Sequence, residues 1–181
     1  MCAKENEIAL SKGVQLCLHC GLCCMGYFHP RAVINNSHDL FFAKKMGAKT
    51  VIDKNNQQLF DLPCPAFDGK CTCYPERPSV CENHQCELLK SVNTEQIDLD
   101  KAINISEKMK SLCVSLDQEL MNLNIKTQTK CFTKRFKPLF ASNKYINIRN
   151  QYPDLFLKYA TYMVLKNRYF YHEGSDFMQD I

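Results

Sequence analysis

Apolar positions in the second half of the chain recur every three or four residues. This spacing predicts two long helices with one buried face each, one over residues 98–122 and one from Pro153 to Phe170. The first has acids in its first turn, and the second starts with proline, which suits the first helical position. The apolar stripe of the first helix consists of Ala102, Ile103, Met109, Leu112, Cys113, Leu116 and Leu120.

The first half shows shorter patterns. Residues 4–16 are mildly amphipathic and predict a short helix. A second helix is predicted from Ser37 to Gly47, with Ser37 as its N-cap and basic residues and glycine at its end. Residues 51–52 and 58–60 predict a short hairpin, and residues 75–78, with proline at both ends, predict a rigid non-helical bend.

These patterns define a fold class. The first half has few long apolar runs, so bound metal is expected to supply much of its folding free energy. We predict a mainly α protein, with an irregular, metal-stapled cysteine module over residues 1–90 followed by a helical carboxy-terminal half over residues 91–181. A length of 181 residues suits one domain, so the helical extension is expected to pack against the module.

The chemistry concentrates between residues 17 and 86, where nine of the twelve cysteines lie. Thiolates are soft ligands that suit zinc and iron-sulfur centres, and the C-x2-C spacing lets two sulfurs share one metal. The alternative is the disulfide framework of an exported protein. The amino terminus lacks the apolar segment of a secretory signal and no stretch reaches the length of a membrane span, so a cytoplasmic protein without membrane association is expected.

The cysteine spacing resembles a known family. Residues 17–24 read C-x2-C-x2-C-C, and residues 64–81 read C-P-x-x-D-G-x-C-x-x-Y-x-x-R-P-x-x-C. Together they resemble the CxxCxxCC, or YkgJ-like, family of zinc- or iron-chelating cysteine-cluster proteins, and a similar motif occurs in flagellin lysine methylases. The resemblance implies metal or iron-sulfur binding. It involves Cys17, Cys20, Gly21, Cys23, Cys24, Asp39, Cys64, Pro65, Cys71, Tyr74, Arg77, Pro78 and Cys81.

The chain departs from the family pattern in two places. Cys73 is an additional thiol, and residues 82–86 replace the aromatic-proline pair that often follows the last motif cysteine. This leaves His84 and Cys86 as extra candidate ligands. The predicted metal ligands are Cys17, Cys20, Cys23, Cys24, Cys64, Cys71, Cys81, Cys86 and His84.

This ligand set is larger than one centre needs. A tetrahedral zinc ion or a 4Fe-4S cluster takes four protein ligands, so either several metals bind or some thiols remain free or buried as small apolar residues. Adjacent Cys23 and Cys24 diverge and are expected to serve two neighbouring ions. Arg77 is either a surface turn residue or a donor that stabilises the negative charge of the cofactor. His19, His29, His38 and His172 are expected on the surface or on helices.

Two function classes remain. The first is a metal-binding protein that acts in redox chemistry or in the modification of a protein or peptide partner. The second is an enzyme whose iron has an open coordination position, and a structural zinc interaction module is a further alternative. Iron or an iron-sulfur cluster is favoured over zinc, because residues 17–23 have ferredoxin-like spacing and Cys64-Pro65 offers a remote ligand. No nucleophile triad, phosphate-binding glycine loop or dinucleotide motif is present.

A basic segment lies between the two long helices. Residues 126–149 include seven Lys or Arg residues and no acid, with Phe132, Phe136, Phe140 and Tyr145 among them. Such a segment is a candidate docking surface for nucleic acid or for an acidic partner. The net charge is only +4, so we favour a solvated face that balances the acidic stretch at residues 87–119.

Overall fold

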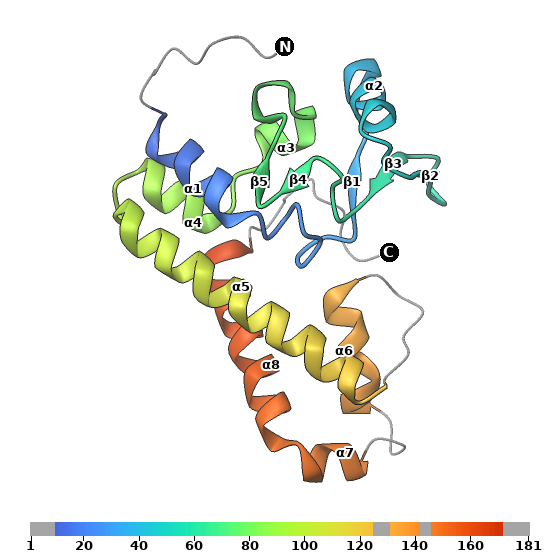
Figure 1. The fold of residues 1–181 in the computed structure, drawn as a ribbon, viewed down its shortest axis with the longest axis vertical. Coiled ribbons are helices and arrows are strands. Elements are labelled where there is room, and N and C mark those ends of the chain that lie inside the picture. The colour runs from blue at the N-terminus through green and yellow to red at the C-terminus, as the bar shows by residue number, and fades with distance from the viewer. Residues whose placement is uncertain (1–9, 125–130, 142–145, 172–181) are drawn as a thin grey trace.

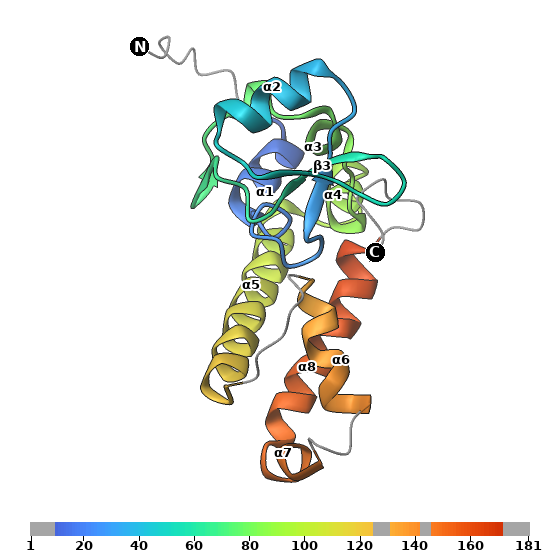
Figure 2. The same cartoon turned by 90° about the vertical axis from the view of Figure 1, so that its right-hand side faces the viewer.

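The computed structural model describes residues 10–124, 131–141 and 146–171. Figures 1 and 2 show an irregular upper lobe, which contains the cysteine window, and helices that extend downward from it. We call residues 10–93 the cysteine lobe and the helices from residue 99 onward the helical arm. The predicted fold class is confirmed, because helices dominate and strands are confined to two small sheets in the cysteine lobe.

The cysteine lobe contains short elements that alternate between helix and strand. Its three-stranded sheet has the antiparallel order β1-β3-β2, with Val51 opposite Leu59. The predicted hairpin is therefore confirmed, whereas β1 was not predicted. The elements are α1 (Lys12–Cys20), β1 (Arg31–Val33), α2 (Ser37–Lys45), β2 (Thr50–Ile52), β3 (Gln58–Asp61), β4 (Phe67–Asp68), β5 (Lys70–Cys71), the 3-10 turn η1 (Tyr74–Glu76), α3 (Ser79–Asn83) and α4 (Glu87–Asn93).

Three local predictions need correction. Helix α1 begins at Lys12 and continues to Cys20, while residues 4–9 of the predicted helix lie outside the described part. The N-cap of α2 is Asn36 rather than Ser37, since the Asn36 side chain accepts a 2.9 Å hydrogen bond from the backbone of Asp39. The predicted bend contains a 3-10 turn, because a proline near the start of a helical turn loses no hydrogen bond.

The helical arm contains the two predicted long helices. Asp98 caps α5 by accepting a 2.7 Å hydrogen bond from the backbone of Lys101, and Pro153 starts α8. The end of α8 widens into a π-helical turn, while Gly174, expected after this helix, lies outside the described residues. The elements are α5 (Leu99–Asn122), α6 (Phe132–Ala141), α7 (Ile146–Gln151), α8 (Pro153–Leu165) and the π-helical turn η3 (Lys166–Phe170).

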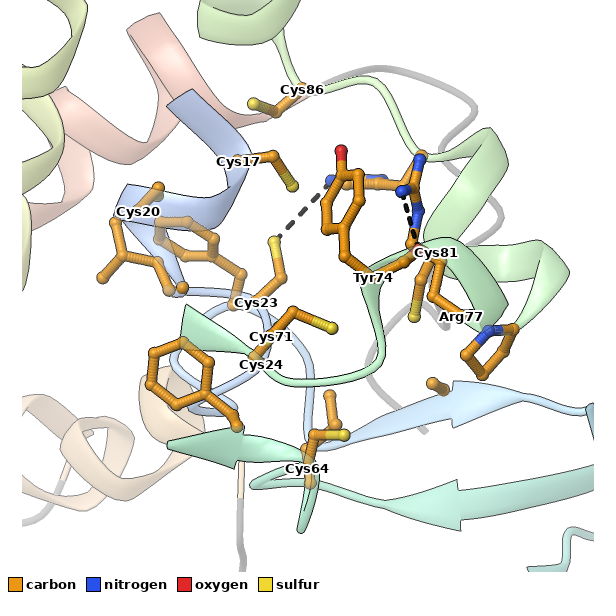
Figure 3. A pocket seen from close by; sticks show the side chains of 18 of the residues that line it. Cys17, Cys20, Cys23, Cys24, Cys64, Cys71, Tyr74, Arg77, Cys81 and Cys86 are labelled. Atoms are coloured by element: carbon orange, nitrogen blue, oxygen red, sulfur yellow. Dashed lines mark hydrogen bonds between the residues drawn. The ribbon is translucent and has the colours of Figure 1, made fainter. Parts of the chain in front are cut away.

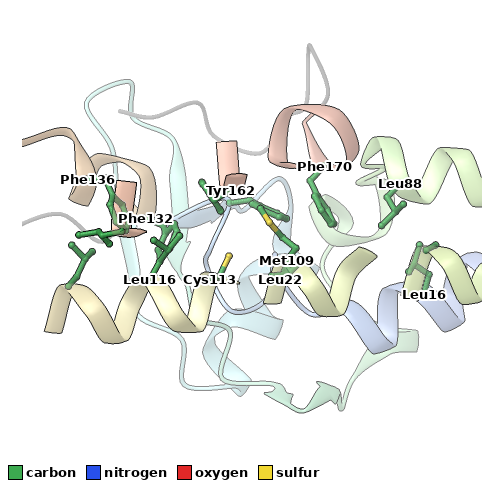
Figure 4. Close-up of a cluster of buried hydrophobic side chains, with 14 of the residues drawn as sticks. Leu16, Leu22, Leu88, Met109, Cys113, Leu116, Phe132, Phe136, Tyr162 and Phe170 are labelled. Atoms are coloured by element: carbon green, nitrogen blue, oxygen red, sulfur yellow. The ribbon is translucent and has the colours of Figure 1, made fainter. Parts of the chain in front are cut away.

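One hydrophobic core joins the cysteine lobe to the helical arm. Figure 4 shows Leu16, Leu22 and Leu88 of the cysteine lobe packed in the same cluster as Met109 and Tyr162 of the arm. The Tyr162 hydroxyl also donates a 3.1 Å hydrogen bond to the carbonyl of Tyr27, next to the cysteine knuckle. The arm therefore buttresses the segment that carries the cysteines. Among the described helices, none combines the length and the apolar character needed to cross a membrane.

A buried carboxylate links two helix starts in the cysteine lobe. Asp39 is fully buried and accepts hydrogen bonds from the backbone of Asn35 (3.0 Å) and from the backbone and hydroxyl of Ser79 (2.8 and 2.7 Å). Burial opposes ionisation of Asp39, but the hydrogen bonds from Ser79 and Asn35 outweigh burial and lower its pKa. Asp39 thereby fixes the first residue of α3, the helix that carries Cys81.

We predict that Asp39→Asn lowers the free energy of unfolding by about 2 kcal/mol or more, because the new amide group faces backbone donors in a buried site. The wild-type contribution is present above the unfolded pKa of the carboxyl and is lost as pH falls through the lower folded pKa. Denaturant unfolding between pH 7 and pH 3 measures both effects. The exposed Asp68 provides the control, and equal losses for Asp39→Asn and Asp68→Asn would contradict the prediction.

Candidate metal centre

Eight of the nine cysteines in the window line a single pocket (Figure 3). The cavity has a volume of about 90 Å³, compared with roughly 10–15 Å³ for one water molecule on the same measure, so it has room for a group of several atoms. No disulfide joins any of the nine window cysteines. Every residue that was predicted as a ligand or as a cofactor contact lines the pocket: Cys17, Cys20, Cys23, Cys24, Cys64, Cys71, Cys81, Cys86, His84 and Arg77.

Cys73, which the sequence offered as an additional thiol, does not line this pocket. Its sulfur lies 3.9 Å from the sulfur of Met46 and 3.9 Å from the Thr72 hydroxyl. Cys73 remains close enough to influence the pKa values of Cys64 and Cys71. Cys73 is therefore a suitable control thiol for variants of the pocket cysteines.

A sharp turn after α1 brings the knuckle cysteines into the pocket. Cys17 and Cys20 lie one helical turn apart, and Gly21 ends the helix with φ 65°. This left-handed conformation favours glycine, and the ring of Phe67 fills the space where a side chain would begin. A Cβ atom at Gly21 would lie 2.2 Å from the Cζ atom of Phe67. The tight turn thus depends on glycine and packs directly against β4.

Adjacent Cys23 and Cys24 interact with different groups of thiols. Cys86 and Cys20 are the strongest thiol influences on the pKa of Cys23, whereas Cys81 and Cys64 are the strongest on Cys24. The backbone of Cys64 also donates a 2.7 Å hydrogen bond to the carbonyl of Cys24.

The same neighbour relations separate seven of the eight thiols into a group of three and a group of four. Cys17 lies between the two groups: it influences Cys20 and Cys86 of one and Cys24 and Cys81 of the other, and Cys71 influences its own pKa. We define set 1 as Cys17, Cys20, Cys23 and Cys86, and set 2 as Cys24, Cys64, Cys71 and Cys81.

Burial and crowding keep these thiols protonated in the absence of metal. Burial, assisted by neighbouring thiols, raises the pKa of Cys20 to about 12 and that of Cys81 to about 12, and it raises the pKa of Cys24 further. A bound metal needs the thiolate form, so metal ligation here must release protons. Metal affinity is therefore expected to increase with pH.

Arg77 supplies positive charge next to the thiols. Its guanidinium lies 3.7 Å from the centre of the Tyr74 ring and donates a 3.1 Å hydrogen bond to the Tyr74 carbonyl. It also lowers the pKa values of Cys17, Cys71 and Cys81, opposing the larger effect of burial. The buried Nε donor of Arg77 has no hydrogen-bond partner among the described residues. A buried donor of this kind fits a pocket that holds an anionic metal-thiolate group.

A cysteine and two histidines form a tighter group at one side of the pocket. The ligand atoms of Cys23, His29 and His84 all lie within 4.8 Å of one another, and among the described residues this is the one group of three metal-ligating side chains that does so. His29 lies in a loop rather than a helix and is partly exposed, and its ring contacts that of His84. The one sequence signal was its position six residues after Cys23.

The predicted basic segment lies only partly in the described structure. Lys126, Lys130 and Lys144 fall outside the described residues. Within the described part, Arg135 of α6 forms an ion pair with Asp117 of α5. This ion pair supports the interpretation that the charges of the basic segment balance acidic residues of the 87–119 stretch.

Comparisons with protein-family models, with curated proteins and with solved structures found no match for this chain.

We predict that Gly21→Ala disrupts the pocket whereas Gly47→Ala does not. Gly47 has a similar φ of 69°, but a Cβ there meets no atom within 4 Å. Both variants pay roughly 1–2 kcal/mol for the left-handed conformation, and only Gly21→Ala must also displace Phe67. Denaturant unfolding and metal content measure the difference. Equal stability and equal metal uptake in the two variants would show that the contact between Gly21 and Phe67 is unimportant.

Proposed function

We propose that this chain is an iron-sulfur protein in which set 1 and set 2 each bind one iron centre, and that it acts in redox chemistry with, or in the modification of, a protein or peptide partner. The observation that carries the proposal is the convergence of eight thiols on one pocket in two sets of four. Four is the number of protein ligands of a 4Fe-4S cluster. Membership in the CxxCxxCC family is part of the same proposal.

The spacing of the thiols supports clusters over single zinc ions. Around a tetrahedral zinc ion with Zn–S bonds of about 2.3 Å, the sulfurs lie roughly 3.8 Å apart. No three of the eight pocket thiols, all of them described, come within 4.8 Å of one another. In a 4Fe-4S cluster each thiolate binds a different iron, so the sulfurs lie farther apart than around one ion. The absence of a tight thiol triplet among the eight is consistent with cluster ligation.

The charge distribution supports the same assignment. Four thiolates leave a 4Fe-4S core in its common state with about two excess negative charges. Arg77 offers a fixed positive charge and a buried Nε donor at this pocket. Hydrogen bonds to cluster sulfurs and nearby charges set the reduction potential of such centres. We assign Arg77 this role.

The position of Cys17 supports exchange with a partner. Cys17 lies between the two sets and is itself exposed at the edge of the pocket. A centre that it ligates would lie near the surface, where a docked protein or peptide reaches it. We therefore favour electron transfer or partner modification over a purely structural role.

We predict that protein isolated without oxygen is brown and contains iron and acid-labile sulfide. The double variant Cys20→Ser/Cys86→Ser removes ligands of set 1, and Cys64→Ser/Cys71→Ser removes ligands of set 2. Each is expected to lose about half of the iron and sulfide, since each set holds one four-ligand cluster. Cys73→Ser, which changes a window thiol outside the pocket, is expected to retain both. Colourless protein with stoichiometric zinc and no iron would overturn the proposal.

We predict that removal of the metal lowers the melting temperature of the whole chain. Metal ligation closes the segment between the knuckle and Cys64–Cys81, and its binding free energy adds to folding. In a domain of this size, about 1 kcal/mol changes the melting temperature by roughly 2–4 °C, so a decrease of at least several degrees is expected. Circular dichroism before and after treatment with a chelator measures it. An unchanged melting curve after complete metal removal contradicts metal-dependent folding.

A further inference from the structure

We infer that Cys23, His29 and His84 form a mononuclear site for a divalent first-row transition ion at the side of the thiol pocket. The inference goes beyond the two iron centres, because His29 and His84 belong to neither set of four thiols. It would place a metal ion with an open coordination position beside a source of electrons.

The geometry of the three side chains supports the site. The Sγ atom of Cys23 lies 3.7 Å from the Nε2 atom of His84, an interaction that Figure 3 marks. The rings of His29 and His84 are nearly perpendicular, with centroids 5.9 Å apart, so the edge of one ring faces the other. Three ligand atoms within 4.8 Å of one another need only small side-chain rotations to reach a common ion.

The backbone holds the three ligands on separate, well-anchored segments. His84 is the C-cap of α3, the helix whose start is fixed by Asp39. His29 precedes Pro30, whose carbonyl accepts a 3.0 Å hydrogen bond from the backbone of Leu62. Cys23 lies in the turn that follows Gly21. The loop that carries Cys23 and His29 and the end of α3 therefore bring ligands from two segments more than fifty residues apart into one location.

The ligand types select the kind of metal. One thiolate and two imidazoles suit borderline ions such as Zn²⁺, Fe²⁺ and Co²⁺, whereas Mg²⁺ and Ca²⁺ need oxygen ligands. Three protein ligands leave a fourth position for water or for a small oxygen or nitrogen donor, as in catalytic metal sites. As whole residues, all three are half-buried.

Cys23 connects this site to the thiol pocket. Its sulfur has more than one lone pair, so a single thiolate can bridge the mononuclear ion and the iron centre of set 1. The competing role for His84 is a hydrogen bond from its ring N–H to the Cys23 sulfur, which would bind no second metal. Metal counting separates these two roles.

The experiment uses Co²⁺ as the probe on the full chain after anaerobic loading with iron and sulfide. Wild-type protein is compared with His29→Gln, His84→Gln and the control His38→Gln, which changes a histidine on α2 that lies outside the pocket. After equilibrium dialysis, cobalt, iron and sulfide are measured per chain. Wild type and His38→Gln are expected to bind about one cobalt ion more than either of the other variants, with equal iron and sulfide in all four.

X-ray absorption at the cobalt edge of wild-type protein provides a readout that needs no variant. Scattering from imidazole rings and one sulfur is the expected result, and its absence overturns the inference even where a variant misfolds. Equal cobalt in all four proteins also overturns it, as does loss of iron from His29→Gln or His84→Gln, because the imidazoles would then belong to an iron centre. A histidine-dependent cobalt ion in protein that takes up no iron would retain the inference and reject the proposed iron-sulfur function.

Discussion

The structure depends on one electrostatic constraint, which is that eight thiols share a single pocket. Without metal they can occupy it only as neutral groups, since burial and mutual repulsion raise their pKa values. Ligation removes their protons, and the metal then supplies the positive charge that compensates the thiolates. The cysteine lobe has only short strands and helices around this pocket, so the proposed metal would add binding free energy to a lobe that buries little apolar surface of its own.

Buried polar side chains hold the pocket in shape from outside. Asp39 joins the starts of α2 and α3, and Arg77 packs on Tyr74 with an unpartnered Nε donor. The two residues differ in whether the protein itself satisfies their hydrogen bonds. Asp39 has its hydrogen bonds satisfied by the protein itself, as expected of a structural residue. Arg77 has one buried donor left over, which the proposed cofactor could satisfy.

The predictable parts of this protein are those with a local or spacing signal. Helices α5 and α8 followed from periodicity and from terminal residues such as Asp98 and Pro153, and the candidate ligands followed from cysteine spacing. Strand β1 has only three residues and exists because it pairs with β3, so its own sequence carried little signal. His29 joins the site through a contact across more than fifty residues with His84. The grouping of Cys24 with Cys64, Cys71 and Cys81 likewise depends on tertiary contacts across forty residues or more, which the local sequence does not signal.

The helical arm bears on the chemistry through the loop that follows the knuckle. Phe170, in the π-helical turn at the end of α8, lines the pocket and packs on Phe28 with ring centroids 4.9 Å apart. Tyr162, two turns earlier on the same helix, binds the carbonyl of Tyr27. Both contacts fall on the segment between Cys24 and His29. Because this segment lies between Cys24 and His29, the packing of α8 bears on the position of candidate ligands of both the thiol pocket and the Cys23/His29/His84 group.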